Sequence, residues 1–375
     1  MAHAALHSAQ LRHLSLNRKP LRLAHMTLQS LGWSAFFEAH QPNTSLQPCR
    51  VVSEGTDLFI VHDGSRETIA FPRGALRDQS EFPPVVGDWV LVAQTGDGRC
   101  LVERILPRRT TIVRKHAGTR AGPQMLAANV DRVLLVTSMD QDFSTRRLER
   151  YLTLILESGA TPIIVLTKAD LVNDTGQFRR EAARCALGFP VLCISNISSE
   201  GIKELRSSLI PQETILLLGS SGVGKSTLVN ALGRAELRAT GTVRETDGKG
   251  RHRTTDRHLI RLPSGVLVID TPGLREVQLW ASDTAVEQTF PEISSLAANC
   301  RFRDCRHAGE PGCAVSVGVE TGQIEMTRLE SFRRLRRELE HLDRQNDPLA
   351  SLLQKRKLKR MMRAHEKQRR HRANP

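Results

Sequence analysis

Aromatic residues are scarce in this chain, which has 375 residues, of which 4% are aromatic and a single one is tyrosine. Recognition of nucleic-acid bases by stacking on aromatic side chains would therefore be limited. Long apolar runs are also lacking, because no stretch approaches the ~20 apolar residues of a membrane-spanning helix. An apolar fraction of 39% is nevertheless enough for globular cores, and the length predicts two or three domains.

Acidic residues are absent from residues 1–30, which contain four lysines and arginines. Residues 328–375 contain 16 lysines and arginines against 6 acidic residues. The two ends thus carry +4 and +10 of the net charge of +14, and the middle of the chain sums to zero. We expect an anionic polymer to be held by the ends of the chain rather than by a uniformly basic body.

Seven cysteines in a chain without a recognisable secretory signal favour a reducing compartment, and we expect a cytoplasmic protein. Residues 1–25 are rich in Ala, His, Leu and Arg, which fits either an organelle transit peptide or a disordered extension. Met26 is an alternative start. Four of the cysteines are scattered in apolar surroundings, where we expect small buried side chains: Cys49, Cys100, Cys185 and Cys193.

The segment 215–227 carries the strongest functional motif. Residues 215–218 are typical of a buried strand, residues 219–226 fit the phosphate-binding spacing G-x-x-x-x-G-K-S, and a helix is expected over 228–232. Lys225 is placed for the β- and γ-phosphates, and the Ser226 hydroxyl for Mg²⁺. The predicted nucleotide-binding residues of this segment are Gly219, Ser220, Ser221, Gly222, Val223, Gly224, Lys225, Ser226 and Thr227.

Asp270 ends a second apolar strand, over residues 266–269, where the Mg²⁺ of a phosphate-loop enzyme needs a carboxylate. Gly273 follows it and can bring its N–H group close to a γ-phosphate. The polar, glycine-bearing residues 248–255 are typical of a switch loop that the γ-phosphate orders. Thr254 is the expected switch threonine, with its hydroxyl on Mg²⁺, and Thr255 is the alternative.

Guanine selection is predicted at the turn Thr167-Lys168-Ala169-Asp170, which follows a strand over 162–166. The Asp170 carboxylate can accept hydrogen bonds from guanine N1–H and N2–H₂, which adenine lacks, so this residue predicts GTP over ATP. The Lys168 stem can pack on the purine face. Thr167 stands where ordinary GTPases have Asn. Ser195-Asn196, at the end of the next strand, could present a backbone N–H group to guanine O6.

The order of these motifs is unusual, because the guanine turn precedes the phosphate loop and Asp270 comes last. The sequence therefore predicts a circularly permuted α/β GTPase domain (order G4-G5-G1-G2-G3) with a doubly wound, mainly parallel sheet. Short strands between residues 51 and 113 predict an OB-type β-barrel upstream, with one edge made basic by Arg104, Arg108, Arg109, Arg114 and Lys115. The predicted parts are an N-terminal extension (1–45), the OB-type barrel (46–115), the GTPase domain (116–283), and a zinc-binding helical domain with a basic tail (284–375).

The C-terminal region contains a candidate metal site and a basic tail. Cys300, Cys305, His307 and Cys313 supply three thiolates and one imidazole, which suit a closed, structural Zn²⁺ site. A disulfide is the alternative, disfavoured in a reducing compartment. An apolar stripe over 329–342 predicts a helix, followed after 347–348 by a second, strongly basic one. That second helix suits RNA phosphate, with a membrane surface as the alternative.

The permuted motifs, the upstream barrel and the cysteine–histidine spacing together resemble the ribosome small subunit-dependent GTPase A family (RsgA, also called YjeQ). The resemblance extends from Met26 to about Thr321 and includes Pro107-Arg108-Arg109-Thr110 and Val86-Gly87-Asp88. It implies a GTP hydrolase that assists late maturation of the 30S subunit, binds 16S rRNA and is stimulated by the subunit. We expect a monomer without a membrane partner. Arg253 interrupts the His-Thr-Thr run usual in the family.

The position after Gly273 holds Leu274, where Ras-like enzymes carry glutamine, so another group must orient the attacking water. Our hypothesis is that His252 does so once the ribosome orders the switch loop. A solvated loop histidine is the alternative. Two other functions stay open at this point: a permuted GTPase of the large subunit, and an RNA chaperone whose nucleotide site is only structural.

Overall fold

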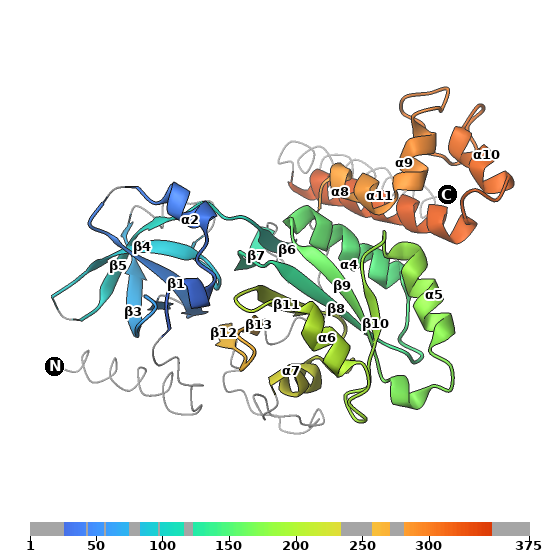
Figure 1. Ribbon diagram of the computed structural model, residues 1–375. Coiled ribbons are helices and arrows are strands. Elements are labelled where there is room, and N and C mark those ends of the chain that lie inside the picture. The colour runs from blue at the N-terminus through green and yellow to red at the C-terminus, as the bar shows by residue number, and fades with distance from the viewer. Residues whose placement is uncertain are drawn as a thin grey trace, which may run out of the picture.

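A computed structural model describes residues 26–42, 44–55, 58–74, 83–96, 98–115, 123–233, 257–270 and 281–346. The switch-loop predictions for His252, Thr254 and Thr255, and the prediction for Gly273, fall outside these residues. So do residues 1–25 and the basic tail beyond residue 346. The described part forms a barrel, an α/β domain and a helical module, which follow one another in Figure 1 from blue through green to orange.

Five strands close into a barrel near the N-terminus. Each strand pairs with the next in the order β1-β2-β3-β5-β4, and β4 pairs back with β1, from Gln47↔Val92 to Arg50↔Trp89. Alternate residues of β1 and β4 point inward, so that Val51, Val90 and Val92 are buried in one apolar core. The predicted OB-type barrel is confirmed. Its strands are β1 (Gln47–Glu54), β2 (Phe59–His62), β3 (Glu67–Pro72), β4 (Trp89–Gln94) and β5 (Cys100–Ile105).

The strand predicted over residues 111–113 does not belong to the barrel. It is β6 (Thr111–Lys115), which pairs antiparallel with β7 (Pro123–Ala128) in a separate two-stranded sheet. Ile112 and Leu126 are fully buried in the same apolar cluster as the helix Thr145–Ser158 of the α/β domain. The hairpin formed by β6 and β7 lies outside the barrel sheet because its apolar face packs against that helix.

The α/β domain is built on a sheet in the order β10-β9-β8-β11-β13-β12, in which all pairs are parallel except β13 with β12. The strands of this part run Arg132–Ser138 (β8), Thr161–Thr167 (β9), Val191–Cys193 (β10), Thr214–Leu218 (β11), His258–Arg261 (β12) and Leu267–Asp270 (β13). Their near-continuous apolar sequences fit strands that are covered on both faces. Those predicted functional turns that the structure describes lie at the carboxyl ends of β9, β10 and β11, and Asp270 ends β13. These are the strand ends at which parallel α/β sheets bind ligands.

Helices cover both faces of this sheet. On one face lie α4 (Thr145–Ser158) and α5 (Gly176–Cys185), and on the other α6 (Ile202–Ser208) and α7 (Lys225–Gly233), each packed in its own apolar cluster. The Ser144 side chain caps α4 by accepting from the Arg147 N–H, and Gly159 ends the helix with φ +79°. The caps fix where α4 begins, which matters because its first turn faces the phosphate loop (Figure 1).

The barrel and the α/β domain share one eleven-stranded sheet, because β1 pairs antiparallel with β12 at Ser53↔His258. Arg50 of β1 is 1% exposed and donates to Thr214 Oγ1 (2.8 Å) and to the Asn129 carbonyl (3.3 Å). Burial lowers the pKa of Arg50 to about 10. The short elements η1 (Gln29–Leu31) and α2 (Ala35–His40) add an aromatic cluster against Trp89.

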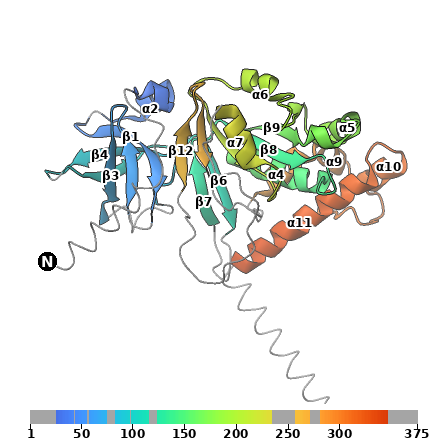
Figure 2. The same cartoon turned by 90° about the horizontal axis from the view of Figure 1, so that it is seen from below.

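The C-terminal helices form a module against α4. They are α8 (Asp283–Thr289), α9 (Pro291–Ala297), α10 (Ala314–Glu320) and α11 (Met326–Asn346). The predicted apolar stripe is buried on α11, at Leu329, Phe332, Leu335, Leu339 and Leu342. Figures 1 and 2 both place α11 alongside α4, in agreement with ion pairs between them (Arg328–Glu149, 2.7 Å; Arg146–Glu330, 2.8 Å).

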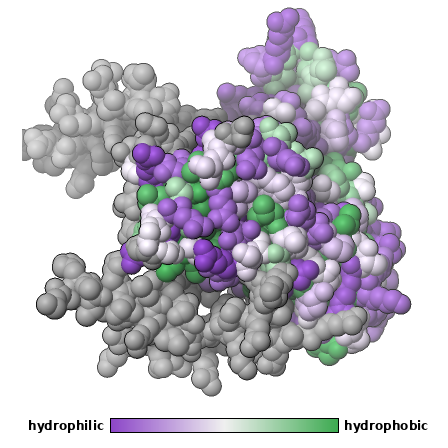
Figure 3. All heavy atoms as spheres, turned by 60° about the vertical axis from the view of Figure 1, so that its left-hand side comes forward, coloured by the Kyte–Doolittle hydropathy of each residue, from purple (hydrophilic) through white to green (hydrophobic). Residues whose placement is uncertain are grey.

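Among the helices that the structure describes, none combines the length and the apolar character needed to cross a membrane. On the face seen with the barrel side turned forward, hydrophobic residues lie in small groups among hydrophilic ones (Figure 3).

Candidate nucleotide-binding and metal sites

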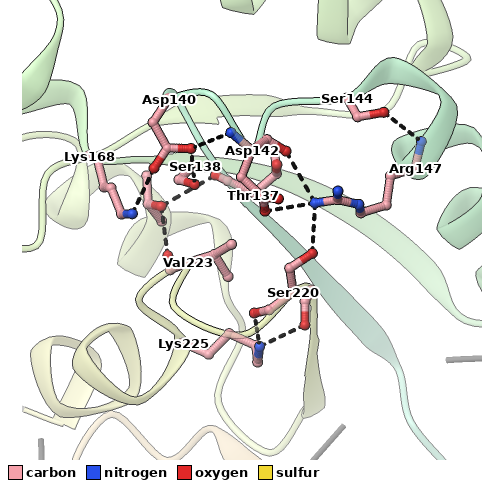
Figure 4. Close-up of polar contacts among 12 residues, drawn as sticks. Thr137, Ser138, Asp140, Asp142, Ser144, Arg147, Lys168, Ser220, Val223 and Lys225 are labelled. Atoms are coloured by element: carbon pink, nitrogen blue, oxygen red, sulfur yellow. Dashed lines mark hydrogen bonds and ion pairs between the residues drawn. The ribbon is translucent and has the colours of Figure 1, made fainter. Parts of the chain in front are cut away.

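The phosphate loop connects β11 to α7 and has the backbone that its glycines allow. Gly219 has φ +148°, and a Cβ atom there would lie 2.0 Å from the Val136 carbonyl oxygen. Gly222 and Gly224 also have positive φ, +81° and +92°. The Lys225 ammonium donates to the carbonyl groups of Gly219 (2.6 Å) and Ser220 (2.5 Å), which wraps the loop around it (Figure 4).

The guanine turn contacts the phosphate loop directly. The Thr167 hydroxyl, fully buried, donates to the Val223 carbonyl at 2.7 Å, with the Thr137 carbonyl at 3.3 Å. The Asn196 amide donates to the Gly224 carbonyl at 3.3 Å. The loops that the sequence assigns to base and phosphate are therefore in direct contact, and Thr167 braces the phosphate loop despite replacing the usual Asn.

Asp170 is held by its neighbour in the next loop. The buried Ser195 hydroxyl donates to Asp170 Oδ1 at 2.5 Å, and its oxygen accepts from the N–H groups of Ile197 and Ser198. Ser195 N–H is taken by the Glu200 carbonyl. The N–H groups of Ser195 and Ile197, on either side of Asn196, are therefore both used within the loop. The N–H group between them is that of Asn196. Ala169 and Asp170 lie in the short helix η2 (Ala169–Leu171), whose Ala169 N–H donates to the Ile194 carbonyl.

Lys168 lies in the left-handed region, with φ +63°, and its ammonium pairs with Asp140 Oδ2 at 2.7 Å. Asp140 follows β8 and also accepts from Ser138 Oγ and the Asp142 N–H. Partial burial opposes ionisation of Asp140, but these bonds outweigh it and hold its pKa below the ordinary value. The pair fixes the Lys168 stem beside the predicted purine position. Sequence reasoning missed Asp140, because only the adjacency of β8 and β9 brings it there.

Arg147, in the first turn of α4, was also missed. Its guanidinium Nη1 donates to Ser220 Oγ of the phosphate loop (2.8 Å) and to the Asp142 carboxylate (2.6 Å) (Figure 4). No pattern in the sequence around residue 147 marks it, since its position depends on α4 packing across the end of β11.

Two of the predicted Mg²⁺ ligands, Ser226 and Asp270, lie on neighbouring elements, and the third, Thr254, is outside the described residues. Asp270 is 4% exposed at the carboxyl end of β13, which pairs in parallel with β11 just before the phosphate loop. Ser226 and Thr227 lie in the first turn of α7. The structure thus brings an oxygen donor from each side of the loop to one end of the sheet, the donor type that Mg²⁺ prefers. Ser221, at the tip of the loop, is exposed.

The basic edge predicted for the barrel is partly used inside the protein. Arg108 forms a bidentate pair with the fully buried Asp88, with both distances 2.7 Å. Arg109 pairs with Asp131 at the start of β8. Both arginines are therefore committed to carboxylates, Arg108 on the barrel itself and Arg109 on the α/β domain.

The predicted metal ligands converge. The donor atoms of Cys300, Cys305, His307 and Cys313 all lie within 4.8 Å of one another, and the site could hold a metal ion. The Nδ1 atom of His307 lies 3.6 Å from Cys300 Sγ and 3.5 Å from Cys313 Sγ. Burial lowers the pKa of His307, which keeps its ring in the neutral form that ligates metals.

A phosphate loop, a guanine turn that precedes it in the chain, and a buried aspartate on the strand beside it define a circularly permuted GTPase of the phosphate-loop class. The RsgA GTPase family model matches residues 105–280. An ABC transporter model also matches, over residues 202–369, a range that includes the phosphate loop.

Relatives and solved structures agree with this class. The chain is similar to the small ribosomal subunit biogenesis GTPases RsgA of Syntrophotalea carbinolica (42% identity, 89% of this chain and 95% of the relative) and of Opitutus terrae (44%, 86% and 93%). The crystal structure of YjeQ from Thermotoga maritima matches with a TM-score of 0.60 (28% identity, 78% of this chain and 98% of that one). YloQ, described as a circularly permuted GTPase, matches with 0.55 (26%, 81% and 98%). The chain belongs to the RsgA GTPase family.

Proposed function

We propose that this GTPase assists maturation of the small ribosomal subunit and that contact with the subunit stimulates its hydrolysis of GTP. The observation that carries the proposal is the extent of similarity to relatives named for small-subunit biogenesis, which covers 89% of the chain. The unmatched 11% is too short to contain the barrel, the GTPase domain or the cysteine–histidine module, so similarity extends to all three. The proposal includes 16S rRNA as the nucleic-acid partner and a monomeric, cytoplasmic protein.

Guanine recognition is assigned to Asp170, whose carboxylate accepts from N1–H and N2–H₂, and to the Asn196 N–H, which donates to O6. The orientation of Asp170 by Ser195 supports this role, because a fixed carboxylate loses less entropy when it binds. Lys168 covers the purine face. The phosphate-loop N–H groups and Lys225 hold the phosphates.

Mg²⁺ is assigned to Ser226, Asp270 and Thr254, and neutralises charge on the phosphate oxygens when bound. The Gly273 N–H is assigned to the γ-phosphate. His252 orients the attacking water, so hydrolysis remains slow until the subunit orders the switch loop. If His252→Ala keeps full subunit-stimulated turnover, this role of His252 is wrong.

Zinc is assigned to the Cys300, Cys305, His307 and Cys313 site. A tetrahedral Zn²⁺ with Zn–S of about 2.3 Å and Zn–N of about 2.0 Å requires S–S edges of about 3.8 Å and S–N edges of about 3.5 Å. The distances between Cys300 Sγ and Cys313 Sγ (3.9 Å) and from His307 Nδ1 to the two sulfurs (3.5 and 3.6 Å) support this assignment. All four positions are filled by protein, as in structural sites.

The test is GTP and ATP turnover with and without purified 30S subunits, with 50S subunits as the comparison. We expect turnover of GTP alone, raised about tenfold or more by 30S subunits, as for GTPases completed by a partner. Co-sedimentation should show binding to 30S and not to 50S. Equal stimulation by 50S subunits would contradict the proposal, and so would subunit maturation that survives Lys225→Ala.

A further inference from the structure

Ser220 is held on two sides by cations. Its hydroxyl accepts from Arg147 of α4 at 2.8 Å, and its carbonyl accepts from the Lys225 ammonium at 2.5 Å (Figure 4). It follows Gly219, whose φ of +148° belongs to the conformations that only glycine adopts readily. The Arg147 contact therefore lies where the phosphate loop leaves β11 and begins to turn.

Arg147 is itself oriented from its own segment. The same Nη1 atom donates to the Asp142 carboxylate at 2.6 Å and to the Asp142 carbonyl at 3.1 Å. Its backbone N–H donates to the Ser144 side chain that caps α4. The Arg147 side chain is 38% exposed, so water reaches it although most of its surface is covered by protein. A charge-assisted donor held in this way restricts Ser220 more than a mobile side chain would.

We infer that Arg147 is a positioning residue for nucleotide binding, which acts through Ser220 on Lys225. By fixing Ser220, it fixes one of the two carbonyl groups that direct the Lys225 ammonium, and so presets the loop for the phosphates. The inference rests on guanine-nucleotide binding by this site and is independent of the small-subunit step, so each can fail without the other.

The experiment measures the affinity of the full-length protein for fluorescent GDP and for a non-hydrolysable GTP analogue, without ribosomes, together with KM and kcat for GTP. Arg147→Ala should weaken both affinities about fivefold and raise KM by a similar factor, with kcat within twofold of the wild-type value. Ser220→Ala should have the same effect. The double variant should be no weaker than either single one, because both remove one shared contact.

Arg146→Ala is the matched control, since this neighbour on α4 pairs with Glu330 of α11 and makes no contact with the loop. It should leave nucleotide affinity unchanged. Arg147→Lys, which keeps the charge, should recover part of the loss. Affinities within twofold of wild type in Arg147→Ala, or full additivity in the double variant, would overturn the inference. If Arg147→Ala does not fold, as seen by circular dichroism, Ser220→Ala decides alone: unchanged affinity would overturn the inference.

Discussion

At the scale of single residues, a hydroxyl in Thr167 does what an amide does in ordinary GTPases. Thr167 Oγ1 lies 2.7 Å from the Val223 carbonyl oxygen, to which it donates, and the Thr167 side chain is fully buried. A threonine is shorter than an asparagine, but the guanine turn and the phosphate loop lie close enough for it to bridge them. The departure from the usual motif therefore leaves the bracing of the loops intact.

We predict that Thr167→Val, which keeps the shape and removes the hydroxyl, destabilises the protein by about 1 kcal/mol and weakens GDP binding. The physical reason is the loss of a buried hydrogen bond between the two loops, with the Val223 carbonyl losing a donor. Denaturant unfolding and GDP titration measure the two effects. Thr167→Ser keeps the hydroxyl and should stay close to wild type in GDP affinity. Equal GDP affinity of the valine variant and wild type would contradict the assignment.

The sequence could predict the residues whose spacing dictates a backbone shape, such as the phosphate loop with Lys225, and the aspartate of the guanine turn. It could not predict Asp140 or Arg147. Asp140 lies in the connection between β8 and α4, and Arg147 lies in the first turn of α4. Both reach the site because β8 lies between β9 and β11 in the sheet. Strand order across a parallel sheet is a non-local property that local spacing does not contain.

At the scale of elements, α4 contacts the C-terminal module through α8 and α11. Arg328 of α11 pairs with Glu149 (2.7 Å) and Glu292 (2.6 Å), and its guanidinium lies 4.6 Å from the ring centroid of Phe290. Glu149 is 4% exposed. Its burial raises its pKa, and the bonds from Ser331 and Arg328 counteract that effect only in part. The ionised form of Glu149 therefore depends on its ion pair with Arg328.

We predict that Arg328→Met destabilises the docking of α11 on α4 by about 3 kcal/mol at neutral pH, because it leaves the Glu149 charge buried without its cation. A raised pKa in the folded state means that stability is fully present below the unfolded value near 4.5 and is lost as pH rises through the folded value. The deficit of the variant should therefore grow between pH 4.5 and pH 7 in denaturant unfolding.

The matched variant is Arg328→Met combined with Glu149→Gln, in which the buried group carries no charge. It should recover part of the lost stability and should lose most of the dependence on pH. A deficit that stays constant across this range would show that lost packing, and not the buried charge, causes the destabilisation.

Elements with a strong period were predictable, and short ones were not. The amphipathic α4 and the stripe on α11 carry enough turns to define a buried face. In contrast, α8, α9 and α10 have seven residues each, too few to distinguish a helical period. β6 was recognised as a strand, but assigned to the wrong sheet. The sequence of a five-residue strand indicates that it pairs with another strand, but it does not indicate which strand that is.

At the scale of the whole molecule, the C-terminal module shares an apolar core with α4 and contains the cysteine–histidine cluster that could hold a metal ion. We predict that removal of the metal by a chelator, or Cys305→Ser, unfolds the region around residues 300–320 and lowers the metal content from about one ion per chain. The reason is that, without the metal ion, the three neighbouring cysteine side chains lose the cation that stabilises their ionised form. Metal analysis and hydrogen exchange measure the result, and GDP affinity should remain, since the nucleotide site lies on other elements. Unchanged exchange in a metal-free protein would contradict a structural role.

The junction between barrel and GTPase domain adjoins the segment predicted to sense the nucleotide. Arg257 lies two residues after the predicted switch loop (248–255) and directly before β12, and its Nη1 donates to Glu54 of the barrel strand β1. The side chains of the pair are 13% and 19% exposed. Strands β1 and β12 pair at Ser53↔His258, one residue before Glu54 and one residue after Arg257. The chain at the start of β12, shortly after the predicted switch loop, is thereby held against the barrel. We therefore expect a change in the switch loop to act on this contact.

We predict that Glu54→Gln speeds hydrogen exchange of residues 257–261 about tenfold, because the mostly buried Arg257 loses its carboxylate. Under the proposed function it should also reduce stimulation by 30S subunits while intrinsic GTP turnover stays near wild type. Glu103→Gln is the control: it makes the same charge change at an equally exposed carboxylate (19%), whose partner Arg73 belongs to the barrel and is 63% exposed. Reduced stimulation without faster exchange would separate the barrel contact from the switch, whereas unchanged exchange and unchanged stimulation would show that the Glu54–Arg257 pair does not transmit the nucleotide state. In the permuted chain order, the barrel precedes β8 and the C-terminal helical module follows Asp270, so that the barrel and this module are joined to opposite ends of the GTPase domain.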